Sequence, residues 1–246
     1  MNDRNTQKNN NPNSELLIVV PAFNEAGSIV RTIKDLVNRY PEYDYIIIDD
    51  GSTDDTNKLC DENDFQHISL PINLGIAGAM QTGFKYANLN HYKYVIQFDG
   101  DGQHKAEYIP IMLENIKNNK SDIMIGSRYL HSTNLKNMRM FGSMILAKEI
   151  KLVTGRIITD PTSGMRLFGE RMINIFASSM NFGPEPDTIS YLIKCGAKVD
   201  ETEVEMQERI TGKSYLNLWR SVFYMLHMCI SIAFIQFFRR KEDLNE

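Results

Sequence analysis

The sequence predicts an α/β domain in which a mostly parallel sheet is covered by helices. Short runs of β-branched and aromatic residues alternate along the chain with longer amphipathic segments, and this alternation is typical of βαβ units. Polar stretches follow the short runs directly, as expected where strands end. The 246 residues are 42% hydrophobic and 24% charged, a composition that can bury one sizeable core.

Each predicted strand is a short apolar run that suits a buried position. In order, the strands are ELLIVV (15–20), YDYIIID (43–49), HISL (67–70), YKYVIQF (92–98) and SDIMIG (121–126). The segments between them carry apolar residues every three or four positions, which indicates amphipathic helices. These predicted helices span residues 26–40, 53–63, 74–89 and 106–119.

Composition also bounds the partners. The formal net charge of −4 and the pI near 5.8 argue against nucleic-acid binding through a general basic field. Cys60, Cys195 and Cys229 are odd in number and widely spaced, so the sequence predicts neither a disulfide framework nor a zinc site. Residues 1–14 are polar and Asn-rich, and we expect a disordered tail there rather than a signal peptide.

Parallel strands place their carboxyl ends at one edge of a sheet, where folds of this class bind ligands. Four polar stretches follow predicted strands: PAFNEAGS, DDGSTDDT, DGDGQH and GSRY. The third contains Asp99 and Asp101 one residue apart, with Gln103 behind them. Their side chains carry oxygen donors, a set that suits a hard divalent cation such as Mg²⁺ or Mn²⁺.

Other interpretations of these motifs are less consistent with the sequence. An Asp-Gly pair often closes a hairpin, but the segment after this one is helical rather than a returning strand. An EF-hand loop beginning at Asp99 would need Gly and Glu where His104 and Pro110 stand. GIAGAMQTG is not a dinucleotide fingerprint, and GKS at 212–214 lacks the earlier Gly of a P-loop. A simple turn remains the structural alternative for the two carboxylates.

Seven stretches, in this order, resemble family 2 glycosyltransferases with the GT-A fold. They are VVPAFNEAGSI, IIDDGSTDDT, NLGIAGAMQTGF, FDGDGQH, GSRY, DPTSGMRLF and ERITGKS. The chain is most similar to the branch that contains dolichyl-phosphate mannose synthase and bacterial polyprenyl-phosphate glycosyltransferases. The resemblance implies a GT-A domain over residues 15–215. It also implies metal-dependent inverting transfer of a sugar from a UDP- or GDP-sugar to a polyprenyl phosphate.

The resemblance also assigns the donor side of the site. The nucleotide-sugar would meet Pro21, Phe23, Glu25, Asp50, Gly75 and Asp99, with Phe23 where the family usually has Tyr. Mg²⁺ or Mn²⁺ would be held by Asp99, Asp101 and Gln103. Structural alternatives stay open, because Glu25 could be a helix-start charge, Asp50 a turn residue and Gln103 a solvated side chain.

An acceptor phosphate needs cations rather than a general base, since its second pKa lies near 6 and it is already an anion at neutral pH. The resemblance places the acceptor phosphate at Arg128, Arg139, Ser143, Arg209 and Lys213, and Arg166 adds positive charge. Arg139 and Lys213 could instead be solvated surface charges. The implied catalytic residues are Asp101, Arg128 and Asp187. Glu185 competes with Asp187 for that role, and the sequence does not separate them.

The segment SVFYMLHMCISIAFIQFF carries no formal charge and precedes Arg-Arg-Lys. Arg220, just before the segment, and Tyr224, His227 and Ser231 within it are polar and recur at helical spacing, whereas Phe223, Leu226, Ile230 and Phe234 form another face. Residues 216–246 are therefore predicted to form an amphipathic helix and tail that lie in the membrane interface. A spanning helix, or packing on the domain or on a second copy, remains the alternative. Residues 138–153 could supply a second membrane-facing helix.

We therefore expect an enzyme on the cytoplasmic face of the plasma membrane, with any anchor or flippase being a separate protein. Two other functions stay open. One is transfer to a sugar hydroxyl in capsule or cell-wall glycan assembly, which the carboxylate at Asp187 would suit. The other is a non-catalytic nucleotide-sugar-binding module, which the intact carboxylate and arginine positions argue against.

Overall fold

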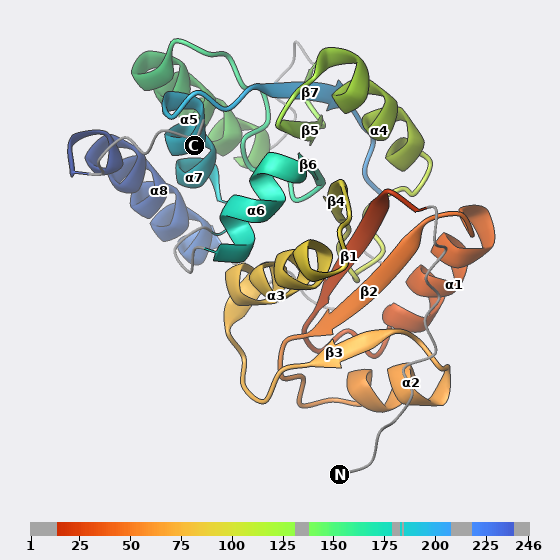
Figure 1. Cartoon of the computed structure of the whole chain (residues 1–246). Coiled ribbons are helices and arrows are strands. Elements are labelled where there is room, and N and C mark those ends of the chain that lie inside the picture. Colours follow the sequence, from red (N-terminus) through yellow and green to blue (C-terminus); the bar gives the residue numbers. More distant parts are fainter. Residues whose placement is uncertain (1–13, 131–137, 179–182, 184, 208–217, 239–246) are drawn as a thin grey trace.

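The computed structural model describes residues 14–130, 138–178, 183, 185–207 and 218–238 (Figure 1). The strands are β1 (Leu16–Ala22), β2 (Asp44–Asp49), β3 (His67–Ser69), β4 (Tyr94–Gln97), β5 (Ile123–Ser127), β6 (Arg166–Gly169) and β7 (Val199–Glu203). The helices are α1 (Ile29–Arg39), α2 (Thr56–Glu62), α3 (Gly75–Leu89), α4 (Tyr108–Asn119), α5 (Met138–Thr154), α6 (Glu170–Ser178), α7 (Pro186–Lys194) and α8 (Leu218–Phe238).

The strands form one seven-stranded sheet in the order β3-β2-β1-β4-β6-β5-β7. All neighbouring pairs are parallel except those of β6, which runs antiparallel to both β4 and β5. Every residue of the central strand β1 is buried, as its continuous apolar sequence predicts. The carboxyl ends of β1, β2, β4 and β5 therefore meet the start of β6 at one edge of the sheet.

Two hydrophobic cores lie on opposite faces of this sheet, because successive strand residues point to opposite sides. Leu17 and Val19 of β1 join a core with residues of α3, α5, α6, α7 and α8, whereas Ile18 and Val20 join residues of α1, α2 and α4. Figure 1 shows α3 and α6 in front of the sheet, with α1 and α2 at the side of β2 and β3. The predicted α/β class is confirmed.

The five predicted strands and four predicted helices are present, with boundaries that differ by a few residues. The sequence did not single out β6 and β7. Both are short, and β7 reads VDETE, which lacks the apolar run expected of a strand. β7 is held as a strand by its pairing with β5 rather than by apolar residues of its own. The pairing runs from Ile123 opposite Val199 to Ser127 opposite Glu203.

Helix α8 packs on α7 and α5 through one face and exposes the other. Met228 and Ile232 are buried in the core, whereas the predicted apolar stripe faces outward. The exposed fractions in this stripe are 69% for Phe223, 55% for Leu226, 58% for Ile230 and 58% for Phe234. Packing on the domain, considered as an alternative, thus holds for the inner face. In the described part of the chain, no helix has the length and apolarity needed to cross a membrane.

Candidate functional site

The predicted metal-binding stretch follows β4 at the carboxyl edge of the sheet. Asp99 accepts a hydrogen bond on Oδ1 from Gln97 Nε2 at 3.0 Å, and its side chain is 33% exposed. Asp101 is buried, and its Oδ1 accepts the backbone N–H of Gln103 at 2.9 Å, which closes an Asx turn. The side-chain amide nitrogen of Gln103 points at Gln207 O, 3.4 Å away. The loop that forms this turn is therefore the same loop that carries the predicted metal ligands.

His104 holds the loop from behind. Its Nδ1 accepts the backbone N–H of Asp99 at 3.0 Å, so a neutral ring must carry its proton on Nε2. Nε2 lies 3.5 Å from Asp99 Oδ2, and the ring is 5% exposed and packs edge-on against Phe98. His104 stands in the same motif as the two carboxylates, but the sequence alone indicates no role for it.

The loop before β6 approaches Asp99 from the other side. A Cβ at Gly164 would come within 2.9 Å of Asp99 Oδ2, so only glycine fits this position without moving the carboxylate. Arg166, the first residue of β6, lies opposite Gln97 in the antiparallel register. Gln97 Oε1 and Arg166 Nη1 are both buried, and neither has a hydrogen-bond partner among the described residues.

The chemistry of this loop fits a divalent cation carried on a diphosphate. Mg²⁺ is commonly bound through one or two carboxylates together with substrate phosphates and water, and Asp99 and Asp101 supply two carboxylates. Within the described residues there is no cluster of three or more His, Cys, Asp or Glu side chains that could hold a metal ion by itself. The two carboxylates could hold a cation together with phosphate oxygens of a bound substrate. Whether Gln103 contributes stays a prediction.

The loops after β1 and β2 form the predicted nucleotide side. Asn24 adopts φ +56°, and its Oδ1 accepts the backbone N–H of Thr53 at 2.8 Å and of Asp54 at 3.3 Å. Glu25 donates its backbone N–H to Thr56 Oγ1, and its Oε2 accepts the hydroxyl of Ser28 at 2.7 Å. Burial opposes the charge of Asp54, but hydrogen bonds from Thr56 and other donors lower the pKa of this carboxyl.

Asp50 connects these loops to the start of α3. Its Oδ1 accepts the backbone N–H of Leu74 at 2.8 Å, next to Gly75, which begins α3 at φ +76°. Pro21 is buried in β1, and Phe23 is partly exposed just beyond it. The structure therefore brings Phe23, Glu25, Asp50 and Gly75 to the same sheet edge as the Asp99 loop. Their contacts with a nucleotide remain predictions.

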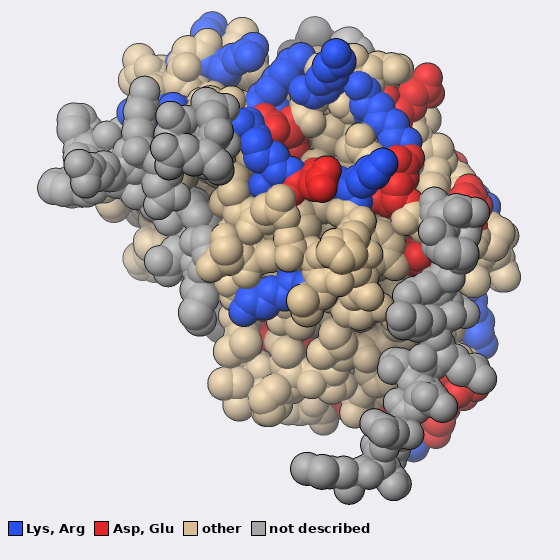
Figure 2. Space-filling model, viewed as in Figure 1, with Lys and Arg blue, Asp and Glu red and all other residues tan. Residues whose placement is uncertain are grey.

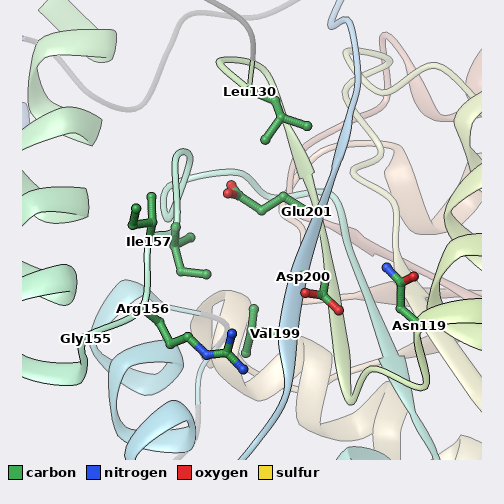
Figure 3. Close-up of a pocket in the computed structure, with 9 residues that line it drawn as sticks. Asn119, Leu130, Gly155, Arg156, Ile157, Val199, Asp200 and Glu201 are labelled. Carbon is green, nitrogen blue, oxygen red and sulfur yellow. The ribbon is translucent and has the colours of Figure 1, made fainter.

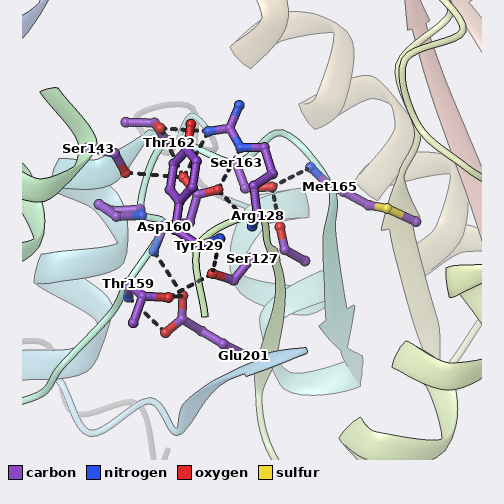
Figure 4. Close-up of polar contacts among 12 residues, drawn as sticks. Ser127, Arg128, Tyr129, Ser143, Thr159, Asp160, Thr162, Ser163, Met165 and Glu201 are labelled. Atoms are coloured by element: carbon purple, nitrogen blue, oxygen red, sulfur yellow. Dashed lines mark hydrogen bonds and ion pairs between the residues drawn. The ribbon is translucent and has the colours of Figure 1, made fainter. Parts of the chain in front are cut away.

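Arg128 and Asp160 form a bidentate ion pair beyond β5 (Figure 4). Arg128 donates from Nε to Asp160 Oδ2 at 2.6 Å and from Nη2 to Asp160 Oδ1 at 2.8 Å. Burial of Asp160 opposes its charge, but the guanidinium of Arg128 holds the pKa of this carboxyl below its ordinary value. Thr162 and Ser143 also donate to Asp160 Oδ1, at 3.0 and 3.1 Å. The Nε–Nη2 edge of the predicted phosphate-binding Arg128 is thus already occupied.

Glu201 of β7 supports this pair from below. Its carboxylate accepts the backbone N–H of Thr159 at 2.8 Å, the Thr159 hydroxyl at 2.9 Å and the backbone N–H of Asp160 at 2.9 Å (Figure 4). Sequence reasoning missed Asp160 and Glu201. Asp160 stands within the DPTSGMRLF motif, whereas Glu201 carries no motif and could be found only through the strand pairing.

The remaining predicted acceptor residues are only partly placed. Ser143 is buried on α5 and donates to Asp160, so it lies beside Arg128, and its contact with a phosphate stays a prediction. Arg139 lies in the first turn of α5, and its side chain is outside the described ones. Arg209 and Lys213 lie outside the described residues.

Glu185 and Asp187 begin α7. Glu185 is the N-cap residue and Asp187 lies in the first turn, where the helix dipole favours negative charge. A Cβ at Gly183 would lie 3.0 Å from Ala77 Cβ in the first turn of α3, so this end of α7 abuts the Gly75 side. Each carboxylate accepts a hydroxyl from α8: Glu185 from Tyr224, and Asp187 from Ser231 at 2.6 Å.

Two surface recesses lie away from this site. The larger, about 480 Å³, is lined by Arg156, Ile157, Asp200 and Glu201 among others (Figure 3). It shares only Glu201 with the network described above, and that carboxylate is already bonded to residues 159 and 160. The chemistry of the Asp99 loop therefore locates the candidate site better than cavity size does.

The second recess lies at the opposite edge of the sheet, where β4 and β5 begin. Figure 2 shows Lys and Arg side chains around a hollow, with acidic side chains among them. The recess is lined by Lys93, Lys117, Lys120, Asp122, Glu170 and Arg171 among others. Arg171 pairs with Asp122, and Lys117 with Glu15, so much of this positive charge is compensated.

Comparison with known proteins supports the resemblance. The chain matches the family model of glycosyl transferase family 2 over residues 17–176. It is 27% identical to an undecaprenyl-phosphate mannosyltransferase of Micrococcus luteus over 214 residues, which cover 82% of this chain and 87% of the relative. It is 29% identical to a UDP-N-acetylglucosamine–dolichyl-phosphate N-acetylglucosaminyltransferase of Methanococcus voltae over 188 residues, or 67% of this chain and 73% of the relative.

Solved structures give the same fold. A mannosyltransferase of Pyrobaculum calidifontis, in complex with GDP-Man and Mn²⁺, superposes with a TM-score of 0.62 at 16% identity over 89% of this chain and 64% of that one. Glucosyl-3-phosphoglycerate synthase of Mycobacterium tuberculosis, with Mn²⁺ and UDP, superposes with a TM-score of 0.61 at 14% identity over 89% and 79%. The expected GT-A architecture is confirmed, and the chain belongs to the family 2 glycosyltransferases.

Proposed function

We propose that this glycosyltransferase moves a sugar from a UDP- or GDP-sugar to a polyprenyl phosphate, with inversion at the anomeric carbon. The loop of residues 160–166 carries the proposal, since it touches both sides of the candidate site. Its Gly164 borders Asp99, and its Asp160 pairs with Arg128. A diphosphate at Asp99 and a second phosphate at Arg128 would therefore be neighbours. The names of the two relatives above support a polyprenyl-phosphate acceptor.

The donor would enter along the edge formed by Phe23, Glu25, Asp50 and Gly75. Asp99 and Asp101 would hold Mg²⁺ or Mn²⁺ against the diphosphate, and the bound cation would stabilise negative charge on the departing oxygens. The buried position of Asp101 and the Gln103 turn keep this carboxylate fixed before the donor arrives. Asp99 is held through its backbone N–H by His104 and through Oδ1 by Gln97.

The acceptor phosphate needs no general base. Its oxygen attacks the anomeric carbon directly, the new C–O bond forms, and the bond to the nucleoside diphosphate breaks with its electrons. The contacts of Arg128 with Asp160 use Nε and Nη2, so Nη1 would be available to the phosphate. Arg suits this role because its planar guanidinium can bind phosphate oxygens. Arg139, Ser143, Arg209 and Lys213 complete the proposed acceptor side.

The proposed location is the cytoplasmic face of the plasma membrane. Helix α8 exposes Phe223, Leu226, Ile230 and Phe234 in one stripe, and Phe141 of α5 is 46% exposed nearby in the fold. An apolar stripe on the outer face of a helix whose inner face packs on the domain suits the headgroup region of a bilayer. The site would then lie close to the surface that presents the lipid phosphate.

The test uses the full chain, undecaprenyl phosphate in vesicles and a panel of UDP- and GDP-sugars. We expect a lipid phosphosugar, labile to mild acid, whose mass identifies the sugar. Chelator should abolish the product and Mn²⁺ should restore it, and Asp101→Asn should lose most turnover with Mn²⁺ present. An oligosaccharide is included as a second acceptor. Transfer only to a hydroxyl of that oligosaccharide would contradict the lipid phosphate assignment. Full turnover in chelator would contradict the metal assignment.

A further inference from the structure

The helix with the exposed apolar stripe also reaches the candidate catalytic carboxylates. On its inner face, Tyr224 donates its hydroxyl to Glu185 Oε2, and Ser231 donates to Asp187 Oδ2 at 2.6 Å. The two hydroxyls stand seven residues apart, which is two helical turns, so they share one face of α8. Both carboxylates belong to the first turn of α7 and its cap.

A backbone contact at the start of α7 also holds one of these carboxylates. Asp187 Oδ1 accepts the backbone N–H of Thr188 at 2.8 Å, so Ser231 and Thr188 together fix both oxygens of this side chain. Burial, and then the charge of Glu185, raise the pKa of Tyr224, so its hydroxyl stays a proton donor at neutral pH. The carboxylate of Glu185 is therefore matched to a permanent donor on α8.

A buried guanidinium lies within electrostatic reach of this cluster. Arg166 is 1% exposed and donates from Nε to Ser163 O at 2.9 Å and from Nη2 to Pro161 O at 2.6 Å. Burial lowers the pKa of Arg166, and Glu185 is the strongest of the groups that oppose this shift, followed by Tyr224. Its Nη1 lacks a partner among the described residues, which is costly for a buried charged donor.

We propose that Tyr224 and Ser231 are positioning residues that set Glu185 and Asp187 at the sugar side of the site. This inference rests on the proposed function. The same helix carries the apolar stripe. Binding of α8 to a lipid surface would therefore be coupled to the orientation of the two carboxylates. Met228 and Ile232 anchor the helix independently of the hydroxyls, so the two roles of α8 can be separated by substitution.

The experiment compares Tyr224→Phe and Ser231→Ala with the unaltered full chain and with His227→Ala. His227 is an exposed polar residue of α8, and the described hydrogen bonds to the two carboxylates come from other residues. Steady-state turnover on vesicles with undecaprenyl phosphate gives kcat and the KM values for donor and acceptor. Vesicle co-sedimentation and the unfolding midpoint report on the seating and stability of α8. Hydrogen exchange of residues 185–190 reports on the start of α7 without requiring turnover.

A positioning role predicts that kcat falls by about tenfold or more in each variant, with KM values within a few-fold. Vesicle binding should match the unaltered chain, and exchange at residues 185–190 should accelerate. Ser231→Thr keeps the hydroxyl and should restore kcat, and His227→Ala should behave like the unaltered chain.

Unchanged kcat in both variants would overturn the proposal. So would a loss of kcat that only parallels a loss of vesicle binding, because that result describes packing of α8 alone. If the unaltered chain transfers no sugar to lipid phosphate, the proposed function fails by itself. In that case hydrogen exchange still tests whether Tyr224 orders the start of α7. Unchanged exchange at residues 185–190 in Tyr224→Phe would contradict a positioning role.

Discussion

Gly164 lies so close to Asp99 that a Cβ on residue 164 would stand 2.9 Å from Asp99 Oδ2. The loop before β6 and the carboxylate after β4 thus share a space that excludes even one methyl group. Since Asp99 is the proposed cation ligand, the position of this carboxylate depends on a residue that has no side chain.

Gly164→Ala should therefore reduce activity more than stability. The added Cβ meets the end of a side chain, so the fold can adapt by turning the Asp99 carboxylate away. We expect turnover to fall by about tenfold or more, as misplacement of a catalytic group commonly causes. Gly169→Ala, at the end of β6, is the control, because its Cβ would make only ordinary contacts with Asp122 O at 3.6 Å and Ser121 O at 3.7 Å. Equal activity in both variants would separate Gly164 from the site.

His104 should act through Asp99. His104→Phe removes the acceptor of the Asp99 N–H and should raise the Mn²⁺ concentration for half-maximal activity by about 10–100-fold, the range seen when support around a metal ligand is lost. His104→Asn can keep an acceptor near the position of Nδ1 and should be milder. His91→Asn, at an exposed residue with φ +60°, provides the control. An unchanged Mn²⁺ requirement in His104→Phe would contradict this role.

Asp160→Asn should destabilise the protein, because it leaves the guanidinium of Arg128 without its partner. Breaking a buried ion pair typically costs about 3 kcal/mol in the free energy of unfolding. The exposed pair of Asp35 and Arg39, with side chains 52% and 55% exposed, supplies the control, and Asp35→Asn should cost less than about 1 kcal/mol. Urea unfolding measures both.

The same pair predicts a pH dependence of defined sign. The folded pKa of Asp160 lies below its ordinary value of 3.8, so the unfolded chain binds more protons in this range and stability rises with pH. The contribution of Asp160 should be complete above the ordinary value and should be lost as pH falls through the folded pKa. The difference in unfolding free energy between the unaltered chain and Asp160→Asn should therefore stay constant above the ordinary value and shrink only as pH falls below 3.8 and through the lower folded pKa. A difference that grows on acidification would contradict the ion pair.

The two faces of α8 should respond oppositely to substitution. Serine at Phe223, Leu226, Ile230 and Phe234 should abolish binding to anionic vesicles and leave the unfolding midpoint nearly unchanged, because these side chains are already exposed. Ile232→Ala on the inner face should cost about 3 kcal/mol, as cavities at fully buried sites do. Vesicle binding that survives the serine substitutions would exclude the stripe as the membrane contact.

The sequence anticipated the parts of this fold that repeat a simple pattern. Five apolar runs became strands, and the polar stretches after them came together, because parallel strands end at one edge. The outward stripe of α8 was also correct as a set of four residues. In each case, local periodicity and strand direction were sufficient.

What the sequence did not give depends on pairing between distant segments. β7 is polar and gains its place only by lying beside β5, which then delivers Glu201 to the backbone of residues 159 and 160. The ion pair between Arg128 and Asp160 could not be predicted either, because the sequence does not show which arginines pair with a carboxylate. The hydroxyls of α8 were seen as a polar face, but nothing local indicated that Tyr224 and Ser231 meet carboxylates on α7.

The loop at Asn24 has a thermodynamic consequence for the donor. With φ +56° and its amide oxygen bound by the backbone of Thr53 and Asp54, Asn24 ties the loop after β1 to the loop after β2 before any ligand is present. A nucleotide that enters between preorganised loops has little chain entropy to remove, whereas ordering of free loops would consume part of the binding free energy. Calorimetry should then find that Asn24→Ala weakens the nucleotide mainly through a less favourable entropy, with the heat of binding largely retained.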